Sequence, residues 1–167
     1  MKKIILILIT IIATGACLPS NQIIPVQGAT TNDWHKYSYW MSPWGASGVH
    51  KGIDIFAKKG TPALASTTGI VIFKGSLNRG GNAIAILGAK WRIHYYAHLK
   101  QHDAYALKWV DRGDKIGEVG DTGNAKGKPP HLHYSILNLI PNPAEITLET
   151  QGWKRMFYIN PSIALKH

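Results

Sequence analysis

Two histidine motifs in this chain have the residue types and spacing of a metal site. His131 and His133 are separated by one residue at the head of an apolar segment, so on a β-strand they would share one face. His50 and Asp54 lie four residues apart, and Gly52 between them favours a loop leading into a strand over a helix. Together with His133 they make a three-ligand set for Zn²⁺ that leaves a fourth position for water. Each motif alone fits an ordinary surface histidine equally well.

A third histidine lies in an aromatic segment. Residues 91–99 have the composition of a strand, whose alternation would place His94, Tyr96 and His98 on one face. Such a histidine is commonly packed and hydrogen-bonded, but beside a metal site His98 becomes a candidate proton carrier. His94, on the same face, would at most support the site. The remaining histidines are expected to be solvated at the surface: His35, His102 and His167.

The elements that must position these residues are short and strand-like. They are bounded by glycine turns and cover residues 53–56, 61–65, 69–75, 82–87, 91–99, 115–120 and 131–136. No helical period occurs between them, so we expect an all-β fold, a compact antiparallel sheet or sandwich. Residues 101–110 fit a helical turn or a loop, and 141–156 fit a loop or an added hairpin. Pro161 predicts a short C-terminal helix over residues 160–165.

Length and composition predict a single turn-rich domain. The chain has 167 residues, enough to bury a core without disulfides, with 17 glycines and only 17% charged residues. The formal net charge is +10 and is spread along the chain. This charge favours anionic partners, namely nucleic acid, anionic lipid or acidic wall polymers.

The N-terminus selects among these partners. Lys2 and Lys3 precede a short apolar run that ends in small residues, the pattern of a secretory signal peptide over residues 1–16. An uncleaved anchor is the alternative, although the run is short for a membrane span. Export would exclude nucleic acid as the partner.

The single cysteine has a position that fits lipidation. Cys17 follows Gly15-Ala16, as in the lipobox of bacterial lipoproteins, with Thr14 where leucine is usual. An exported chain with one cysteine cannot form an internal disulfide, and lipidation gives the thiol a role. We therefore expect a lipidated Cys17 and a linker over residues 17–33, followed by the domain over residues 34–167.

The chemistry-bearing motifs also occur together in a known family. In order they are His50-x-x-x-Asp54, Tyr96-Ala97-His98-Leu99 and His131-Leu132-His133. Between them lie Gly60-Thr61-Pro62, Gly81-Asn82-Ala83-Ile84, Gly113-Asp114-Lys115-Ile116-Gly117 and Gly120-Asp121-Thr122-Gly123. Over about residues 39–136 the chain resembles the lysostaphin/LytM-type zinc endopeptidases.

This resemblance implies a site and an activity. One Zn²⁺ would be held by His50, Asp54 and His133 in a groove of the β domain, with His98 and His131 as catalytic residues that do not bind metal. The substrate would be peptide bonds in the stem peptides or cross-links of bacterial peptidoglycan. The protein would be an exported, membrane-anchored lipoprotein on the periplasmic side of the cell envelope, with other envelope proteins as further candidate partners.

The alternative is a non-catalytic LytM-type lipoprotein that binds peptidoglycan and activates wall amidases. The presence of all five site residues favours the enzyme over this alternative.

If histidines act as the bases, the rate of hydrolysis should fall below about pH 6.

One wall of the expected groove departs from the family pattern. Trp44 is expected to line the groove, but Ala46 stands where the family frequently has arginine, and the connection to His50 is short. Asn82 is expected to support a turn near the site.

Overall fold

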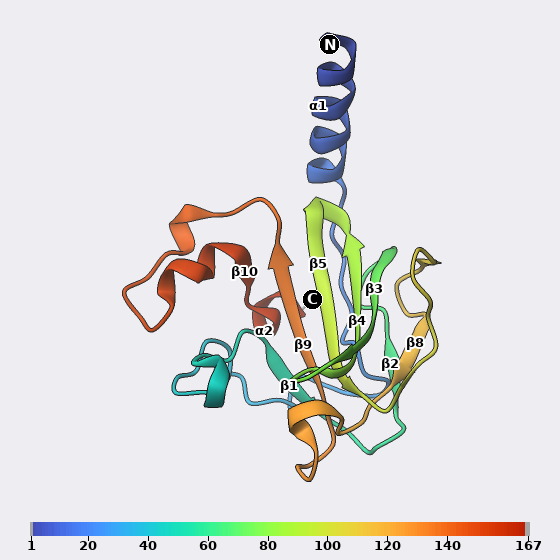
Figure 1. Cartoon of the computed structure of the whole chain (residues 1–167), viewed down its shortest axis with the longest axis vertical. Helices are drawn as coiled ribbons and strands as arrows, with labels where there is room; N and C mark the ends of the chain where they lie inside the picture. The colour runs from blue at the N-terminus through green and yellow to red at the C-terminus, as the bar shows by residue number, and fades with distance from the viewer. Residues whose placement is uncertain (1, 166–167) are drawn as a thin grey trace.

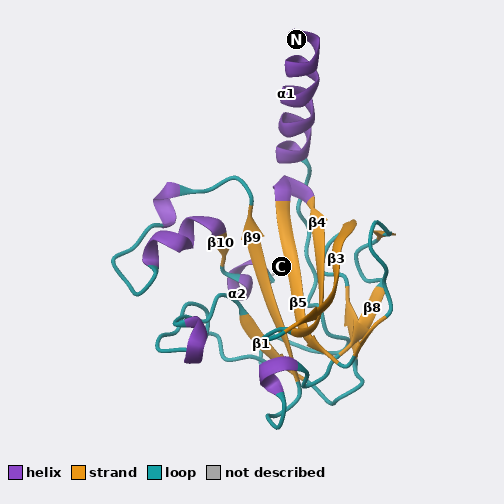
Figure 2. Cartoon of the chain, viewed as in Figure 1, coloured by secondary structure: helices purple, strands orange, loops and turns teal. Residues whose placement is uncertain are grey.

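The folded part of the chain consists of two antiparallel β-sheets with short helices at the periphery (Figure 1 and Figure 2). The computed structural model describes residues 2–165. Its strands are β1 (Ile53–Phe56), β2 (Pro62–Leu64), β3 (Gly69–Leu77), β4 (Gly81–Gly88), β5 (Arg92–Leu99), β6 (Gln101–His102), β7 (Trp109–Val110), β8 (Lys115–Glu118), β9 (His131–Asn138) and β10 (Tyr158–Ile159). The predicted all-β antiparallel fold is confirmed.

The larger sheet separates a buried face from a groove-lining face. Its strand order is β1-β9-β5-β4-β3-β7, and β10 pairs with the far end of β9. On β9, Leu132 and Tyr134 are fully buried in the core, as period-2 alternation requires when His131 and His133 face the groove. The β1–β9 register places Asp54 opposite His133. Two neighbouring strands thus direct polar side chains to one face while their alternate residues anchor both strands.

The smaller sheet, ordered β2-β8-β6, shares its core with the larger one. Ala63 of β2 and Ile116 of β8 are fully buried in the same hydrophobic cluster as Ile53, Ile55 and Tyr96 of the larger sheet. Burial of each large side chain in this cluster contributes about 1.5–3 kcal/mol relative to exposure. The core therefore supports the groove floor from behind.

Part of the segment expected to be a linker lies against the domain. Pro25 and Val26 are buried, and the segment around them runs along β2 instead of hanging free. Its backbone makes three bonds of 3.0 Å, from Ile23 N to Ser66 O, from Leu64 N to Pro25 O, and from Gln27 N to Pro62 O. The sequence around these residues is polar and contains glycine, which is typical of a loop, so its pairing with β2 was not predicted.

The helices lie outside the sheets. Helix α1 (Lys2–Cys17) projects from the domain, and α2 (Pro161–Ala164) ends the described chain. Within residues 2–165, no helix has both the length and the apolar character needed to cross a membrane. Asn160 caps α2 through Ser162 N, 3.0 Å from its side-chain oxygen, and Pro161 occupies the first turn, so the predicted helix is confirmed.

The two segments without a firm prediction are now assigned. Residues 101–110 contain β6, a loop and β7, with no helical turn. Residues 141–156 form loops with two 3-10 helices, η4 (Pro143–Glu145) and η5 (Gly152–Phe157), and no added hairpin.

Candidate active site

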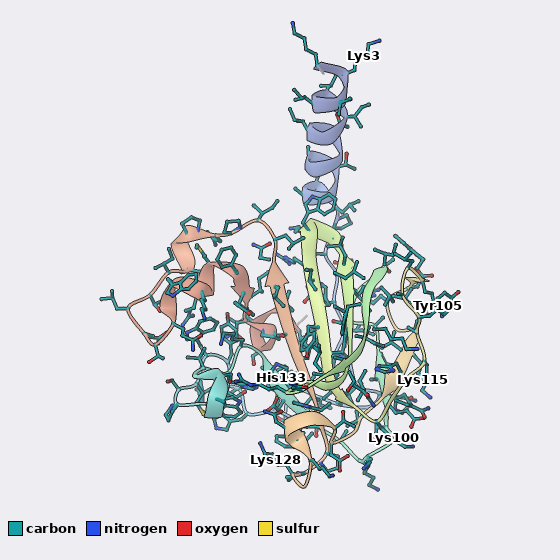
Figure 3. All side chains as sticks on the ribbon, in the orientation of Figure 1. Lys3, Lys100, Tyr105, Lys115, Lys128 and His133 are labelled. Carbon is teal, nitrogen blue, oxygen red and sulfur yellow. The ribbon has the colours of Figure 1, made fainter. Side chains whose placement is uncertain are left out.

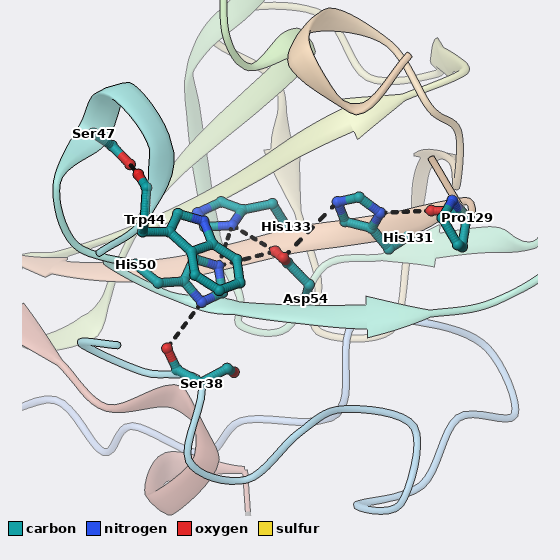
Figure 4. Close-up of polar contacts among 8 residues, drawn as sticks. All are labelled: Ser38, Trp44, Ser47, His50, Asp54, Pro129, His131 and His133. Carbon is teal, nitrogen blue, oxygen red and sulfur yellow. Dashed lines mark hydrogen bonds and ion pairs between the residues drawn. The ribbon is translucent and has the colours of Figure 1, made fainter. Parts of the chain in front are cut away.

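Three predicted metal ligands meet at one point of the groove floor (Figure 4). Asp54 Oδ1 lies 3.0 Å from His50 Nε2 and 2.8 Å from His133 Nδ1. The two histidine nitrogens are 3.1 Å apart. His50 arrives on the loop before β1, Asp54 on β1 and His133 on β9, so the sheet register itself assembles the cluster.

The spacing and chemistry of these donors fit a zinc ion. With zinc–ligand bonds of about 2.0–2.1 Å, neighbouring corners of a tetrahedron lie about 3.3 Å apart, close to the three separations here. Two imidazoles and one carboxylate are also a common donor set for catalytic zinc, because three protein ligands leave one position open. The residues therefore fit the ion that the sequence predicts.

Backbone carbonyls and burial hold the donors in the required state. His50 is 1% exposed, and its Nδ1 donates to Ser38 O at 3.0 Å, which leaves Nε2 as the lone-pair nitrogen aimed at Asp54. Burial alone would raise the pKa of Asp54, but the hydrogen bonds with His133 and His50 outweigh it and hold this pKa well below its usual range. Burial lowers the pKa of His133, although Asp54 opposes the shift. A carboxylate and neutral imidazoles are the forms that bind metal.

The two predicted proton carriers flank this cluster without joining it. His131 Nδ1 lies 2.8 Å from Pro129 O, and His98 Nδ1 lies 2.9 Å from Thr122 O. Each ring therefore donates from Nδ1 to a carbonyl and keeps Nε2 as an acceptor. His131 Nε2 is 4.0 Å from Asp54 Oδ2, and the ring centroids of His98 and His131 are 5.0 Å apart.

His98 is largely buried, with 7% of its surface exposed. Burial lowers its pKa to about 4, and repulsion from His133 and His131 adds to the shift against the opposing effect of its carbonyl partner and Asp54. His98 is therefore a neutral imidazole at neutral pH.

The face predicted for His98 is wrong. His98 lines the groove with Tyr95 and Ala97, whereas Tyr96 is fully buried on the core side. The cause is a β-bulge: one residue of β4 faces two of β5 between the pairs Asn82–Leu99 and Ile84–Tyr96, and His98 has a φ of 64°. The extra residue shifts the alternation by one, and His98 turns to the groove.

His94 stays on the core side of β5, separate from the site. It is fully buried, and its Nδ1 lies 2.6 Å from the hydroxyl oxygen of Tyr134. Of the histidines expected at the surface, His35 is exposed, but His102 is half-buried with Nε2 3.1 Å from Gly75 O. His167 lies outside the described residues.

The donor cluster forms part of the floor of a groove with a volume of about 1050 Å³. The Trp44 indole stacks on the His50 ring, with centroids 4.2 Å apart and an interplanar angle of 20°, so the expected wall role of Trp44 agrees with its place. Ala46 lacks the arginine frequent in the family, yet Arg79 Nη1 from the β3–β4 turn donates to Ala46 O at 3.1 Å. The guanidinium at this wall of the groove therefore comes from Arg79 and not from position 46.

Several contributors to the site carry no recognisable signal in the sequence. Ser38, Thr122 and Pro129 act through their carbonyl oxygens, which every residue type possesses. Gly52 is a different case, because a Cβ there would overlap Tyr134 O and lie 3.0 Å from the His133 ring. Asn82, expected to support a turn near the site, lies near the start of β4 and donates from its side-chain amide to Lys100 O, 3.1 Å away at the bend between β5 and β6.

Comparisons with known proteins match the same region. A model of peptidase family M23 matches residues 48–144, more than half of the chain. The chain is 42% identical over 104 residues to DD-carboxypeptidase/endopeptidase Mpg of Neisseria meningitidis serogroup B, covering 61% of this chain and 24% of that protein. It is 38% identical over 114 residues to the L-Ala–D-Glu endopeptidase of Bacillus subtilis, covering 62% of this chain and 35% of that protein. It thus spans only about a quarter to a third of these relatives.

A solved structure extends the match to the fold. The catalytic domain of the antimicrobial peptidase lysostaphin from Staphylococcus simulans superposes with a TM-score of 0.63 at 27% identity, covering 82% of this chain and 96% of that domain. The matched span contains all five residues of the site described above. The chain belongs to peptidase family M23.

Proposed function

We propose that this protein is a zinc-dependent endopeptidase that hydrolyses peptide bonds in the stem peptides or cross-links of peptidoglycan. The observation that supports this proposal most directly is the cluster of His50, Asp54 and His133 with two further histidines beside it in an open groove. Zinc ligands alone would fit a structural site, but such a site usually has four protein donors. Three donors with two flanking bases suit hydrolysis.

Each residue of the site has a role that follows from its geometry. His50 Nε2, Asp54 Oδ1 and His133 Nδ1 would hold the metal. Zinc in such a site supplies Lewis acidity, which lowers the pKa of a water molecule and polarises a substrate carbonyl. The Trp44 indole stacks on the His50 ring and covers that face of it.

The flanking histidines handle protons and developing charge. Because Pro129 O and Thr122 O fix the Nδ1 protons of His131 and His98, each Nε2 can accept a proton from the attacking water. Once protonated, the same atom can donate to the oxyanion that develops on the substrate or to the departing amine. Phe56, whose ring lies 5.6 Å from that of His131, limits the positions this imidazole can take.

The test is digestion of purified peptidoglycan sacculi with zinc-loaded wild-type protein and with His133→Ala, followed by mass analysis of the released fragments. We expect the wild type to release peptide fragments whose masses identify the cleaved bond, and the variant to release none. Binding to sacculi without hydrolysis would refute the enzyme and favour the non-catalytic, amidase-activating alternative. Equal zinc content in wild type and Asp54→Ala would refute the ligand assignment.

We further propose that the protein works at the cell envelope as a lipoprotein anchored through Cys17. Cys17 is exposed at the end of α1, and residues 23–27 are already bound to the domain surface. A lipid on Cys17 would therefore keep the domain within a few residues of a membrane. Whether this anchor exists does not affect the groove chemistry.

A further inference from the structure

Three separate segments direct cationic side chains into the groove. Lys51 follows His50, Arg79 lies on the β3–β4 turn, and Lys128 lies on the loop before β9. Figure 3 shows Lys128 on that loop, at the same end of the sheet as His133. Among the described groove-lining residues, Asp54 is the only acid, and it belongs to the donor cluster.

These cations have hydrogen-bonding capacity to spare. Arg79 donates from Nη1 to Ala46 O, and Lys51 donates from Nζ to Ser47 O at 3.2 Å, so both brace the 3-10 helix η1 (Gly45–Ser47). A guanidinium has five N–H donors and an ammonium three, and each of these two bonds uses one of them. Within residues 2–165, none of the three cations forms an ion pair with an acidic side chain.

Other lysines in the fold, in contrast, form ion pairs. Lys59, Lys100 and Lys115 are all matched by nearby carboxylates, at 2.7 to 3.0 Å. Unmatched cations that line a concave surface raise the local concentration of anions, because the low-dielectric walls focus their field.

We propose that the groove binds an anionic peptide, one that carries a free carboxylate near the scissile amide, and that Arg79 and Lys128 hold this carboxylate. The substrate would then be a directly cross-linked stem peptide with free carboxylates and not an uncharged glycine bridge. A glycine bridge offers only amides, so it would leave these cations without a partner. A guanidinium matches a carboxylate with two parallel hydrogen bonds, which gives orientation as well as affinity.

This inference deepens the proposed function, since it names the substrate class of the same groove. It is nevertheless separable from catalysis, because binding of the peptide can be measured without cleavage. The required ligands are a cross-linked stem-peptide dimer with its free carboxylates, the same dimer with these groups converted to primary amides, and pentaglycine. The amidated dimer keeps the shape and loses only the charge.

The first measurement compares the three peptides on the zinc-loaded wild-type protein, by dissociation constant and by kcat/KM. We expect the free-acid dimer to exceed the amidated dimer by about tenfold or more in both quantities, as a charge-assisted hydrogen bond predicts. Equal values for acid and amide, or a preference for pentaglycine, would overturn the inference. Preferential binding of the acid with no cleavage would refute the proposed enzyme while supporting this inference.

The second measurement assigns the effect to the named residues. Arg79→Gln keeps an amide donor for Ala46 O, and Lys128 is exposed, so Arg79→Gln/Lys128→Gln is expected to fold normally. We expect this double variant to reduce the acid-to-amide ratio toward one. The matched control is Lys74→Gln/Lys126→Gln, which removes the same charge from exposed positions outside the groove and should leave the ratio unchanged. Equal loss in both double variants would overturn the role of Arg79 and Lys128.

Discussion

Gly52 is expected to control the position of His133, and Gly52→Ala tests how tightly this donor is held. The glycine sits between His50 and Asp54, and its Cα faces the neighbouring strand β9. An added methyl would overlap Tyr134 O and lie 3.0 Å from Cε1 and Nε2 of His133. The carbonyl belongs to a residue paired with Ile53, so it can move only if the β1–β9 ladder opens.

The size of the effect follows from these contacts. Ordinary van der Waals contact begins at 3.4 Å, so the His133 ring must retreat by 3.4 − 3.0, which is about 0.4 Å. Ligand distances in metal sites tolerate about 0.2 Å. We therefore expect the zinc affinity to fall about 10- to 100-fold, which is about 1.4–2.7 kcal/mol. Overpacking should also reduce the free energy of unfolding by about 1–3 kcal/mol.

The assay is competition for zinc against a chromophoric chelator, combined with denaturant unfolding of the metal-free protein. Gly117→Ala is the matched control, because its methyl would lie 2.5 Å from Gln101 O in the smaller sheet, which contributes none of the three metal donors. We expect both variants to lose stability and only Gly52→Ala to lose zinc affinity. If Gly52→Ala binds zinc as tightly as Gly117→Ala does, Gly52 does not position His133.

Four further outcomes are expected. His131→Ala should keep the zinc content of the wild type and hydrolyse sacculi at least about 100-fold more slowly, and an unchanged rate would exclude it from catalysis. Because burial lowers the pKa of His98 to about 4, hydrolysis that needs neutral His98 should stay level from about pH 8 to 6, whereas a midpoint near pH 6.5 would identify another group. Burial lowers the pKa of His94 from 6.5 to about 3, so below pH 6.5 the unfolded chain binds a proton that the folded protein does not. The free energy of unfolding should therefore fall by about 2 kcal/mol between neutral pH and pH 5. Urea unfolding of wild type and His94→Phe measures this cost, and equal pH slopes would contradict it. Finally, Cys17→Ser should abolish fatty-acid labelling and membrane partition, and unchanged partition would refute the lipid anchor.

The strands and the placement of the His131–His133 pair were predictable because they depend on regular alternation. Leu132 between the two histidines is fully buried, so both histidines must face away from the core. The same rule failed for His98, because the bulge in β5 depends on a two-against-one match with β4 that a single strand's sequence does not encode. Pairing between strands, not the strand itself, decides this face.

The groove lining was predictable only in part, for a related reason. The groove-lining position of Trp44 was predicted because Trp44 lies shortly before His50 in the sequence. Arg79 was not predicted, because it reaches the same wall from a turn far along the chain. Similarly, Val26 looked like part of a linker and is 2% exposed, because it pairs with Ala63 across a short bridge. Contacts of this kind become visible only when distant segments are brought together.

The distance along the chain between the donors has a consequence for timing. His133 lies 79 residues after Asp54, and the two meet only through the β1–β9 ladder. An unfolded or half-folded chain has His50 and Asp54 close together but has neither the third donor nor the groove floor. The donor cluster is therefore complete only once the sheet has formed, and a chain that has not yet folded has no assembled site for the proposed zinc ion.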